Sequence, residues 1–224
     1  MIIKLNEDGS NLATIVKEIN GRKKEKIITV DDLIASIIAS NRMGSFEKVI
    51  SPLYRQVMNS TLIQSINYAK NSSIYIIHRK KCQAPVQIFS RFYGDVGFPG
   101  LLFAIDVVNN KLIKLYVVAV KDDDIKEDTK IYRYPFTNVS GKTGSVCLGS
   151  NHFEKGILEG DKLFNVINQF FSMPNTLHSY SPHNNTRKYE FEKMIRLLTN
   201  KEFDDQLLVE NTDLKTYIEW IEKL

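Results

Sequence analysis

Residues 101–120, LLFAIDVVNNKLIKLYVVAV, decide the fold of this chain. Two runs of β-branched, aromatic and other apolar residues, Leu101–Ile105 and Leu112–Val120, flank the pair Asn109-Asn110, which favours a tight turn. The stretch therefore predicts two antiparallel strands joined by a short connection.

Further strands are expected before this pair. Ile74–His78 and Val86–Phe89 are similar apolar runs, and turn residues separate the runs at Gly94-Asp95, Gly97 and Pro99-Gly100. Strands at this short spacing predict an antiparallel meander through the middle of the chain.

The N-terminal third shows mixed signals. Short strands are expected at Ile2–Leu5 and Lys26–Val30. Thr29 and Asp32 resemble a capping box, which opens a helix through the apolar residues Leu33, Ile34, Ile37 and Ile38.

Helices dominate the last third. Apolar residues at helical spacing predict a helix over 158–171 that Pro174 ends. A second helix is expected around Phe191–Leu198, and a last one from a cap at Thr212 or Asp213 to Leu224.

One helix is also expected earlier, over Phe46–Met58. It runs either through the whole range or from Pro52 onward, because proline is tolerated in the first turn of a helix. The order of mixed segments, then strands, then helices predicts an α+β fold rather than a doubly wound sheet.

Composition sets outer limits on the function. The 224 residues carry a net charge of +4, and 43% are hydrophobic. Short basic runs at 22–24 and 79–81 are typical of solvated faces, which makes nucleic-acid binding an unfavoured hypothesis. The acidic run Asp122-Asp123-Asp124 favours a solvated loop over a divalent-cation site, because no further ligand spacing accompanies it.

Two cysteines, Cys82 and Cys147, do not make a disulfide framework. The chain starts without a signal-peptide pattern and has no apolar run of about 20 residues, the length that a membrane helix needs. We therefore expect a cytoplasmic protein with reduced thiols.

Cys147 is the main candidate for a catalytic residue. It ends the run Tyr134–Cys147, YPFTNVSGKTGSVC, in which Asn138 lies nine positions upstream. A thiol can hold an acyl group as a thioester, and an amide can stabilise the oxyanion that forms when this group is attacked. The alternatives are a buried structural cysteine and a turn asparagine that bonds its own backbone.

Histidines supply weaker candidates. His152 and His178 could each lie near the thiol and lower its pKa or carry a proton, whereas His78 falls in a predicted strand and is expected to be structural. The chain has no zinc-ligand spacing and no phosphate-binding loop, so no cofactor is expected.

The segment Tyr134 to Gly149 resembles the active-site segment of ubiquitin-conjugating enzymes. In these enzymes His-Pro-Asn leads to a Gly-x-x-Cys motif, and here Gly144-Ser145-Val146-Cys147 keeps that second half. Pro135 and Asn138 resemble the proline and the asparagine, but two residues separate them and Tyr134 precedes the proline in place of the histidine.

The departures resemble one subgroup, the prokaryotic family D of ubiquitin-conjugating-like proteins, which includes the PRTRC system protein B. The matching pieces are Tyr132–Val139, Gly144–Gly149, Phe170-Phe171-Ser172 and His178. The resemblance implies a ubiquitin-conjugating-like core at 71–183, between an α/β extension at 1–70 and a helical extension at 184–224.

The resemblance also implies a function in a bacterial ubiquitin-like modification pathway. A ThiF-type activating enzyme would pass a ubiquitin-like β-grasp modifier to Cys147 as a thioester, and a target amine would then attack. The pathway would include a JAB-type metallopeptidase. Asn138 would stabilise the oxyanion, and His178 would substitute for the missing histidine of the motif.

Two other hypotheses remain open at this stage. The chain could be a non-catalytic adaptor that retains the fold to bind the modifier or the activating enzyme. It could also be a cysteine hydrolase, which requires a histidine within hydrogen-bond reach of Cys147.

Overall fold

In the computed structural model, the two apolar runs of residues 101–120 form strands β10 (Gly100–Val108) and β11 (Lys111–Val120), which pair antiparallel. Asn109 and Asn110 join them, and both have a positive φ, 50° and 62°. Two consecutive positive φ values give a turn whose twist matches that of the strand pair, and asparagine tolerates this conformation well. The predicted pair of strands is confirmed together with its turn.

The structure describes residues 2–5, 11–19, 22–34, 49–51, 55–57, 59–89, 91–149, 151, 153 and 156–223. The chain divides into two compact units, residues 1–47 and 48–224. Several residues named in the expectations above lie outside the described residues: Ile37, Ile38, Phe46, Pro52, Met58, His152 and Leu224.

The first unit contains a three-stranded antiparallel sheet in the order β1-β2-β3. Its strands are β1 (Ile2–Leu5), β2 (Leu12–Ile19) and β3 (Arg22–Thr29). The Oγ1 of Thr29 accepts a hydrogen bond from the Asp32 N–H at 3.1 Å, and a helical turn covers residues 30–34. The two predicted strands and the predicted cap are confirmed, while β2 was not expected.

The second unit is built on one sheet with the order β13-β12-β11-β10-β7-β6-β4, and β5 also pairs with β6. Its other strands are β4 (Val49–Ser51), β5 (Arg55–Val57), β6 (Ser60–Ala69), β7 (Ser72–Arg79), β12 (Lys130–Tyr132) and β13 (Glu210–Asp213). Each of these pairings is antiparallel, which confirms a mixed α/β protein with antiparallel strands.

The helix expected over Phe46–Met58 is wrong for the described part of this range. Val49–Ser51 and Arg55–Val57 are strands, and both pair with β6. Ile50 lies opposite Ile66, which is fully buried. Pairing along this edge satisfies backbone groups of β6 and suits β-branched residues, so it overrides the helical spacing of the sequence.

Strands β8 (Cys82–Ile88) and β9 (Arg91–Phe98) form a separate two-stranded sheet between β7 and β10 in the sequence. We expected turns at Gly94-Asp95 and Gly97, but both lie inside β9. A Cβ atom at Gly97 would come within 2.3 Å of the carbonyl oxygen of Lys201. These turn predictions are wrong because glycine here lets another segment approach the strand closely.

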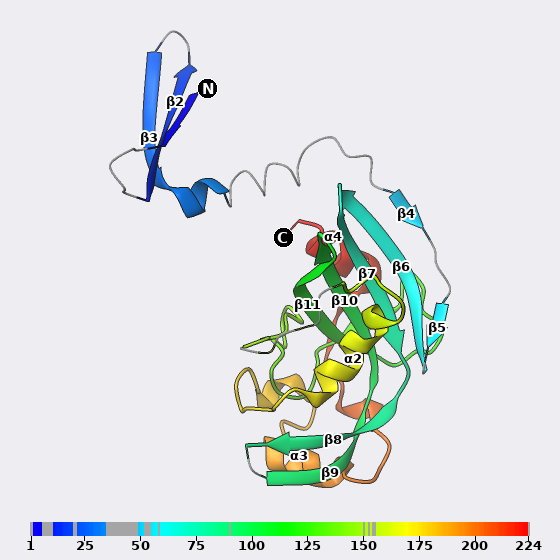
Figure 1. Cartoon of the computed structure of the whole chain (residues 1–224). Coiled ribbons are helices and arrows are strands. Elements are labelled where there is room, and N and C mark those ends of the chain that lie inside the picture. Colours follow the sequence, from blue (N-terminus) through cyan, green and yellow to red (C-terminus); the bar gives the residue numbers. More distant parts are fainter. Residues whose placement is uncertain are drawn as a thin grey trace. The chain divides into compact units, whose positions relative to one another are not determined.

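Both faces of the main sheet are covered, which explains the uninterrupted apolar runs of β10 and β11. Phe103 belongs to the core cluster that includes α2 (Lys162–Ser172), while its neighbours Leu102 and Ala104 belong to the cluster that includes α4 (Leu214–Ile221). Figure 1 shows α2 and α4 on opposite sides of these strands. Because side chains alternate along a strand, a strand covered on both faces is apolar at successive positions.

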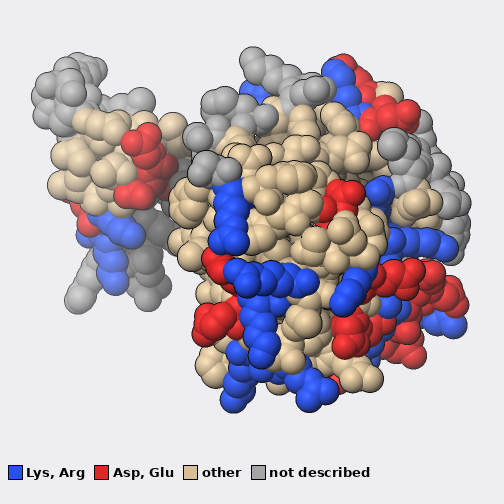
Figure 2. Space-filling model, turned by 90° about the horizontal axis from the view of Figure 1, so that it is seen from below, with Lys and Arg blue, Asp and Glu red and all other residues tan. Residues whose placement is uncertain are grey.

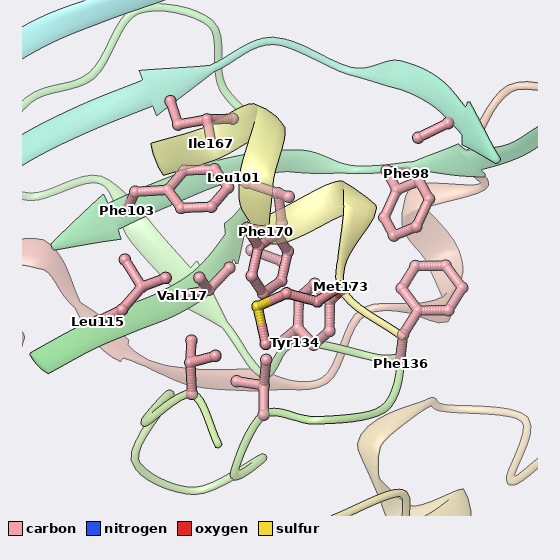
Figure 3. Close-up of a cluster of buried hydrophobic side chains, with 14 of the residues drawn as sticks. Phe98, Leu101, Phe103, Leu115, Val117, Tyr134, Phe136, Ile167, Phe170 and Met173 are labelled. Atoms are coloured by element: carbon pink, nitrogen blue, oxygen red, sulfur yellow. The ribbon is translucent and has the colours of Figure 1, made fainter. Parts of the chain in front are cut away.

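An aromatic cluster joins α2 to the sheet and to the loop after β12 (Figure 3). The rings of Phe103 and Phe170 lie 5.4 Å apart, and those of Tyr134 and Phe170 lie 5.8 Å apart. Phe136 extends the cluster at 5.7 Å from Tyr134. Edge-to-face pairs of this kind contribute about 1 kcal/mol beyond the buried area, so they fix the loop to the core.

The predicted C-terminal helices are confirmed, except that the first begins at Lys162 and Leu158 lies in a turn before it. Helix α2 ends at Ser172, two residues before Pro174, and α3 spans Phe191–Leu198. The carboxylate of Asp213 caps α4 by accepting the Thr216 N–H at 2.8 Å. Strand β13, just before α4, was not expected. Two short 3-10 helices lie at Pro182–Asn184 and Asp205–Leu207. No helix in the described part of the chain has the length and apolar character to cross a membrane.

The basic run at residues 79–81 is matched by acidic partners. Lys80 lies 3.6 Å from Asp123, and Lys81 forms an ion pair with Asp205. Figure 2 shows basic and acidic side chains next to one another on one face of the molecule. Exposed pairs of this kind contribute about 0–1 kcal/mol, so they balance local charge more than they stabilise the fold.

His78 in β7 makes the stability of the protein depend on pH. Its side chain is buried, and its Nε2 has no hydrogen-bond partner among the described residues. Burial lowers the pKa of His78 below its ordinary value, although the charge of Asp123 opposes this shift. The unfolded chain therefore binds a proton more readily, and stability falls as the pH drops below about 6.5.

We expect His78→Gln to remove this part of the pH dependence. Urea unfolding at about pH 8 and about pH 5.5 should show a smaller acid-induced loss of free energy for the variant than for the natural chain. An equal loss in both proteins would contradict the assignment to His78.

Candidate active site

The cysteine segment, residues 138–147, folds as a hairpin that we call the cysteine hairpin. Val139 and Val146 form an antiparallel bridge, and the Cys147 N–H donates to the carbonyl oxygen of Asn138 at 2.8 Å. Residues paired in this way lie directly opposite each other on neighbouring strands. The nine-position spacing of the sequence thus becomes a cross-strand neighbour pair.

Strand β11 holds the cysteine hairpin along the edge that faces away from β10. The Val117 N–H donates to the Gly144 carbonyl oxygen at 2.7 Å, and the Val146 N–H donates to the Leu115 carbonyl oxygen at 2.9 Å. Gly144 has a φ of +73°, and a Cβ atom there would lie 2.8 Å from the carbonyl oxygen of Val117. Only glycine fits this position, so the approach of the hairpin to the sheet is encoded in the motif.

Cys147 is an exposed free thiol. The second cysteine, Cys82, is half-buried, and burial raises the pKa of its thiol. Because the thiolate is the nucleophile, Cys147 is the better placed of the two for chemistry. Among the described residues, no histidine is hydrogen bonded to the Cys147 thiol, and His152, five positions downstream, lies outside these residues.

The side chain of Asn138 is turned toward the clamp segment, residues 174–178, which follows α2. Asn138 has a φ of +63° and is 8% exposed. Its Nδ2 donates to the Pro174 carbonyl oxygen at 2.8 Å, and its Oδ1 accepts from the N–H and the hydroxyl of Thr176 at 3.3 and 3.2 Å. The amide nitrogen has two hydrogens, and only the one directed at Pro174 has an acceptor in the described part of the chain.

The clamp segment also holds the main chain of the hairpin. The Asn138 N–H donates to the His178 carbonyl oxygen at 3.0 Å, while the His178 imidazole is exposed. The Thr137 Oγ1 donates to the Asn175 Oδ1 at 2.7 Å, and the Asn175 N–H donates to the Gln87 carbonyl oxygen at 3.2 Å. The clamp segment therefore connects the cysteine hairpin to β8, and His178 takes part through its backbone.

Tyr134, which stands before the proline of the motif, has a structural position. It is 3% exposed, and its ring contacts Phe136 and Phe170. Burial raises the pKa of Tyr134 well above its ordinary value, so it stays a neutral phenol. Tyr134 supports the cysteine hairpin from the core.

The space beside Asn138 is small. A cavity of about 10 Å³, lined by Tyr134, Asn138, Met173 and neighbouring residues, is large enough for about one water molecule. Among the described residues, no group of three or more His, Cys, Asp and Glu side chains is placed to hold a metal ion.

The structure thus brings the backbones of Cys147, Asn138 and His178 together. Thr137 and Thr176, which hold the Asn138 loop on either side, were not expected to take part. The one local signal for this contact is Pro174, which ends α2 and directs the chain toward Asn138. The rest is contact between distant segments, which no short motif encodes.

An antiparallel sheet that carries an exposed cysteine on a hairpin at β11 defines a mixed α/β protein with a candidate site at this thiol. The family model of prokaryotic E2 family D matches residues 45–211, a range that contains the cysteine hairpin and the clamp segment. The chain belongs to this family, which confirms the resemblance found in the sequence. No curated protein and no solved structure gives a significant match to the chain.

Selective alkylation tests the exposure of the thiol. Iodoacetamide should modify Cys147 of the native protein roughly tenfold faster than Cys82, because Cys82 is partly buried and its pKa is raised. Mass spectrometry of the two cysteine peptides over time measures both rates, and urea should make them similar. Equal rates in the native protein would contradict this placement of the thiols.

Proposed function

We propose that this chain is a ubiquitin-conjugating-like enzyme in a bacterial ubiquitin-like modification pathway. It accepts a ubiquitin-like β-grasp protein from a ThiF-type activating enzyme as a thioester on Cys147, and it transfers this protein to a target amine. A JAB-type metallopeptidase belongs to the same pathway. The observation that carries the proposal is the exposed Cys147 thiol opposite Asn138, inside the range that the family model matches.

The proposed reaction is two acyl transfers. The Cys147 thiolate attacks the thioester carbonyl on the activating enzyme, a new carbon–sulfur bond forms, and the thiolate of that enzyme leaves. A target amine then attacks the Cys147 thioester, the amine loses a proton, and the Cys147 thiolate leaves as the amide forms. A thiolate is a good leaving group, so the carrier needs little base machinery of its own.

Asn138 and His178 have separate roles in the proposal. The amide hydrogen of Asn138 that Pro174 does not use would donate to the oxyanion of the second step. His178 braces the loop, and its carbonyl oxygen, which accepts the Asn138 N–H, supports this role. The brace that histidine supplies in the familiar motif would thus come from the clamp segment.

The proposal extends to the architecture. Residues 71–183 would form a ubiquitin-conjugating core, with an N-terminal extension at 1–70 and a C-terminal extension at 184–224. The antiparallel strands β7, β10 and β11, followed by the cysteine hairpin and α2, support this assignment. A reducing cytoplasm would keep the Cys147 thiol free for the pathway.

Reconstitution with an activating enzyme, a modifier and ATP tests the proposal directly. The chain should form a modifier adduct that thiol reductant removes and that Cys147→Ala abolishes, while Cys147→Ser should give an adduct that resists reductant. Cys82→Ser is the matched control and should leave the adduct unchanged. If no reductant-sensitive adduct formed, the proposal would be wrong for the activating enzyme and the modifier that were used.

The same variants separate the enzyme from an adaptor. In cells that depend on the pathway, Cys147→Ala should abolish modification of targets. Full pathway function of Cys147→Ala would instead indicate a non-catalytic adaptor that binds the modifier or the activating enzyme.

Asn138 has a further test of its own. Asn138→Ala should slow discharge of the thioester to an amine about a hundredfold, the usual cost of one oxyanion donor, with little effect on thioester formation. Thr176→Val removes a brace of Asn138 but keeps the amide, so its effect on discharge should be much smaller. Equal losses in the two variants would show that Asn138 acts only by holding the loop.

A further inference from the structure

The C-terminal helix reaches the cysteine hairpin from a part of the chain that the family model does not cover. The matched range ends at residue 211, and α4 begins at Leu214. The Tyr217 hydroxyl on α4 donates to the Thr143 carbonyl oxygen at 2.9 Å, and the Asn211 Nδ2 donates to the Lys142 carbonyl oxygen at 3.3 Å. Two successive carbonyl groups at the tip of the hairpin are therefore held by the C-terminal segment.

The contact at Tyr217 is close and buried. Tyr217 is 5% exposed, and a Cβ atom at Gly144 would lie 2.5 Å from its hydroxyl oxygen. Gly144 thus leaves room for two neighbours at once, β11 and α4. Burial also raises the pKa of Tyr217 above its ordinary value, so the hydroxyl keeps the proton that it donates.

The C-terminal helix is itself fixed to the sheet. Its first residue, Leu214, donates its N–H to the Thr129 carbonyl oxygen at 2.9 Å, just before β12. The ring of Tyr217 stacks on Trp220 at 5.8 Å, and Trp220 contacts Tyr116 of β11 edge to face at 6.1 Å. Tyr217 is therefore presented to the hairpin by a helix that is held at both ends.

We propose that Tyr217 is a positioning residue for Cys147 and that α4 completes the site. The hydroxyl of Tyr217 fixes the tip of the cysteine hairpin, and the tip fixes the strand that ends at Cys147. The consequence for acyl transfer rests on the proposed function, whereas the brace itself does not.

Amide hydrogen exchange of the full chain tests the brace without any partner protein. Tyr217→Phe keeps the ring and removes one hydrogen bond, so the amides of Val117, Val146 and Cys147 should exchange roughly fivefold faster. The matched control is Tyr68→Phe, which removes a tyrosine hydroxyl bonded to Asp106 at 2.6 Å on another strand. This control should leave the three hairpin-linked amides unchanged relative to the rest of the sheet.

Two results would contradict the inference that Tyr217 fixes the tip of the cysteine hairpin. One is unchanged exchange at Val146 and Cys147 in Tyr217→Phe, and the other is an equal increase at all protected amides, which would indicate a loss of global stability alone. Asn211→Ala is a milder second variant at an exposed contact, and it should raise exchange at the same amides by a smaller factor.

A kinetic measurement tests the positioning role. With free lysine as acceptor, Tyr217→Phe should lower the maximal rate of Cys147 thioester discharge at least about threefold at an unchanged KM for lysine, because misplaced reacting atoms lower the rate of the chemical step. If Tyr217→Phe discharged the thioester at the same maximal rate as the natural chain, the positioning role would be wrong. If the natural chain formed no thioester, the proposed function would be wrong instead. The hydrogen-exchange result would still test the contact between Tyr217 and the hairpin.

Discussion

The backbone of β11 has to form hydrogen bonds along both edges, because its second half is buried. Leu115 and Val117 have essentially no exposed surface, and an unpaired N–H or carbonyl group in such a place is costly. One edge pairs with β10, and the other pairs with β12 at Val120 and with the cysteine hairpin at Leu115 and Val117. The hairpin that carries Cys147 is thus required by the sheet as well as by the site.

Three parts of the molecule meet at this hairpin. β11 supplies its edge, the clamp segment holds Asn138, and α4 reaches the tip through Tyr217. The aromatic cluster around Phe170 fixes the loop that leads into it. An exposed thiol is therefore carried on a backbone with little freedom, which suits chemistry that depends on the geometry of attack.

The parts of the fold that the sequence predicted are those with a local signal. The apolar runs around Asn109-Asn110 and the cap at Asp213 depend on neighbouring residues, and the structure confirms both. The glycines of β9 and the helix expected over Phe46–Met58 were assigned wrongly. In both cases contacts with other segments decide the conformation: Lys201 approaches Gly97, and pairing with β6 keeps β4 and β5 extended.

The candidate site follows the same rule. Cys147 and Asn138 lie on one hairpin, so their relation could be predicted from spacing and turn residues. Thr176 and Tyr217 approach from 38 and 74 positions along the chain from their hydrogen-bond partners, and nothing in their local sequence marks them. Tyr134 is the opposite case. Its place in the motif marks it as a candidate site residue, but it is buried and belongs to the core.

The place of the cysteine hairpin along β11 has a consequence for the solubility of the folded chain. An uncovered strand edge offers a row of unpaired N–H and carbonyl groups to any other extended chain and is a template for aggregation. The residues from Gly144 to Val146 occupy this row at Leu115 and Val117. The segment that presents the thiol thus also shields the sheet from association with other molecules, so the position of the thiol and the protection of this edge depend on the same few residues.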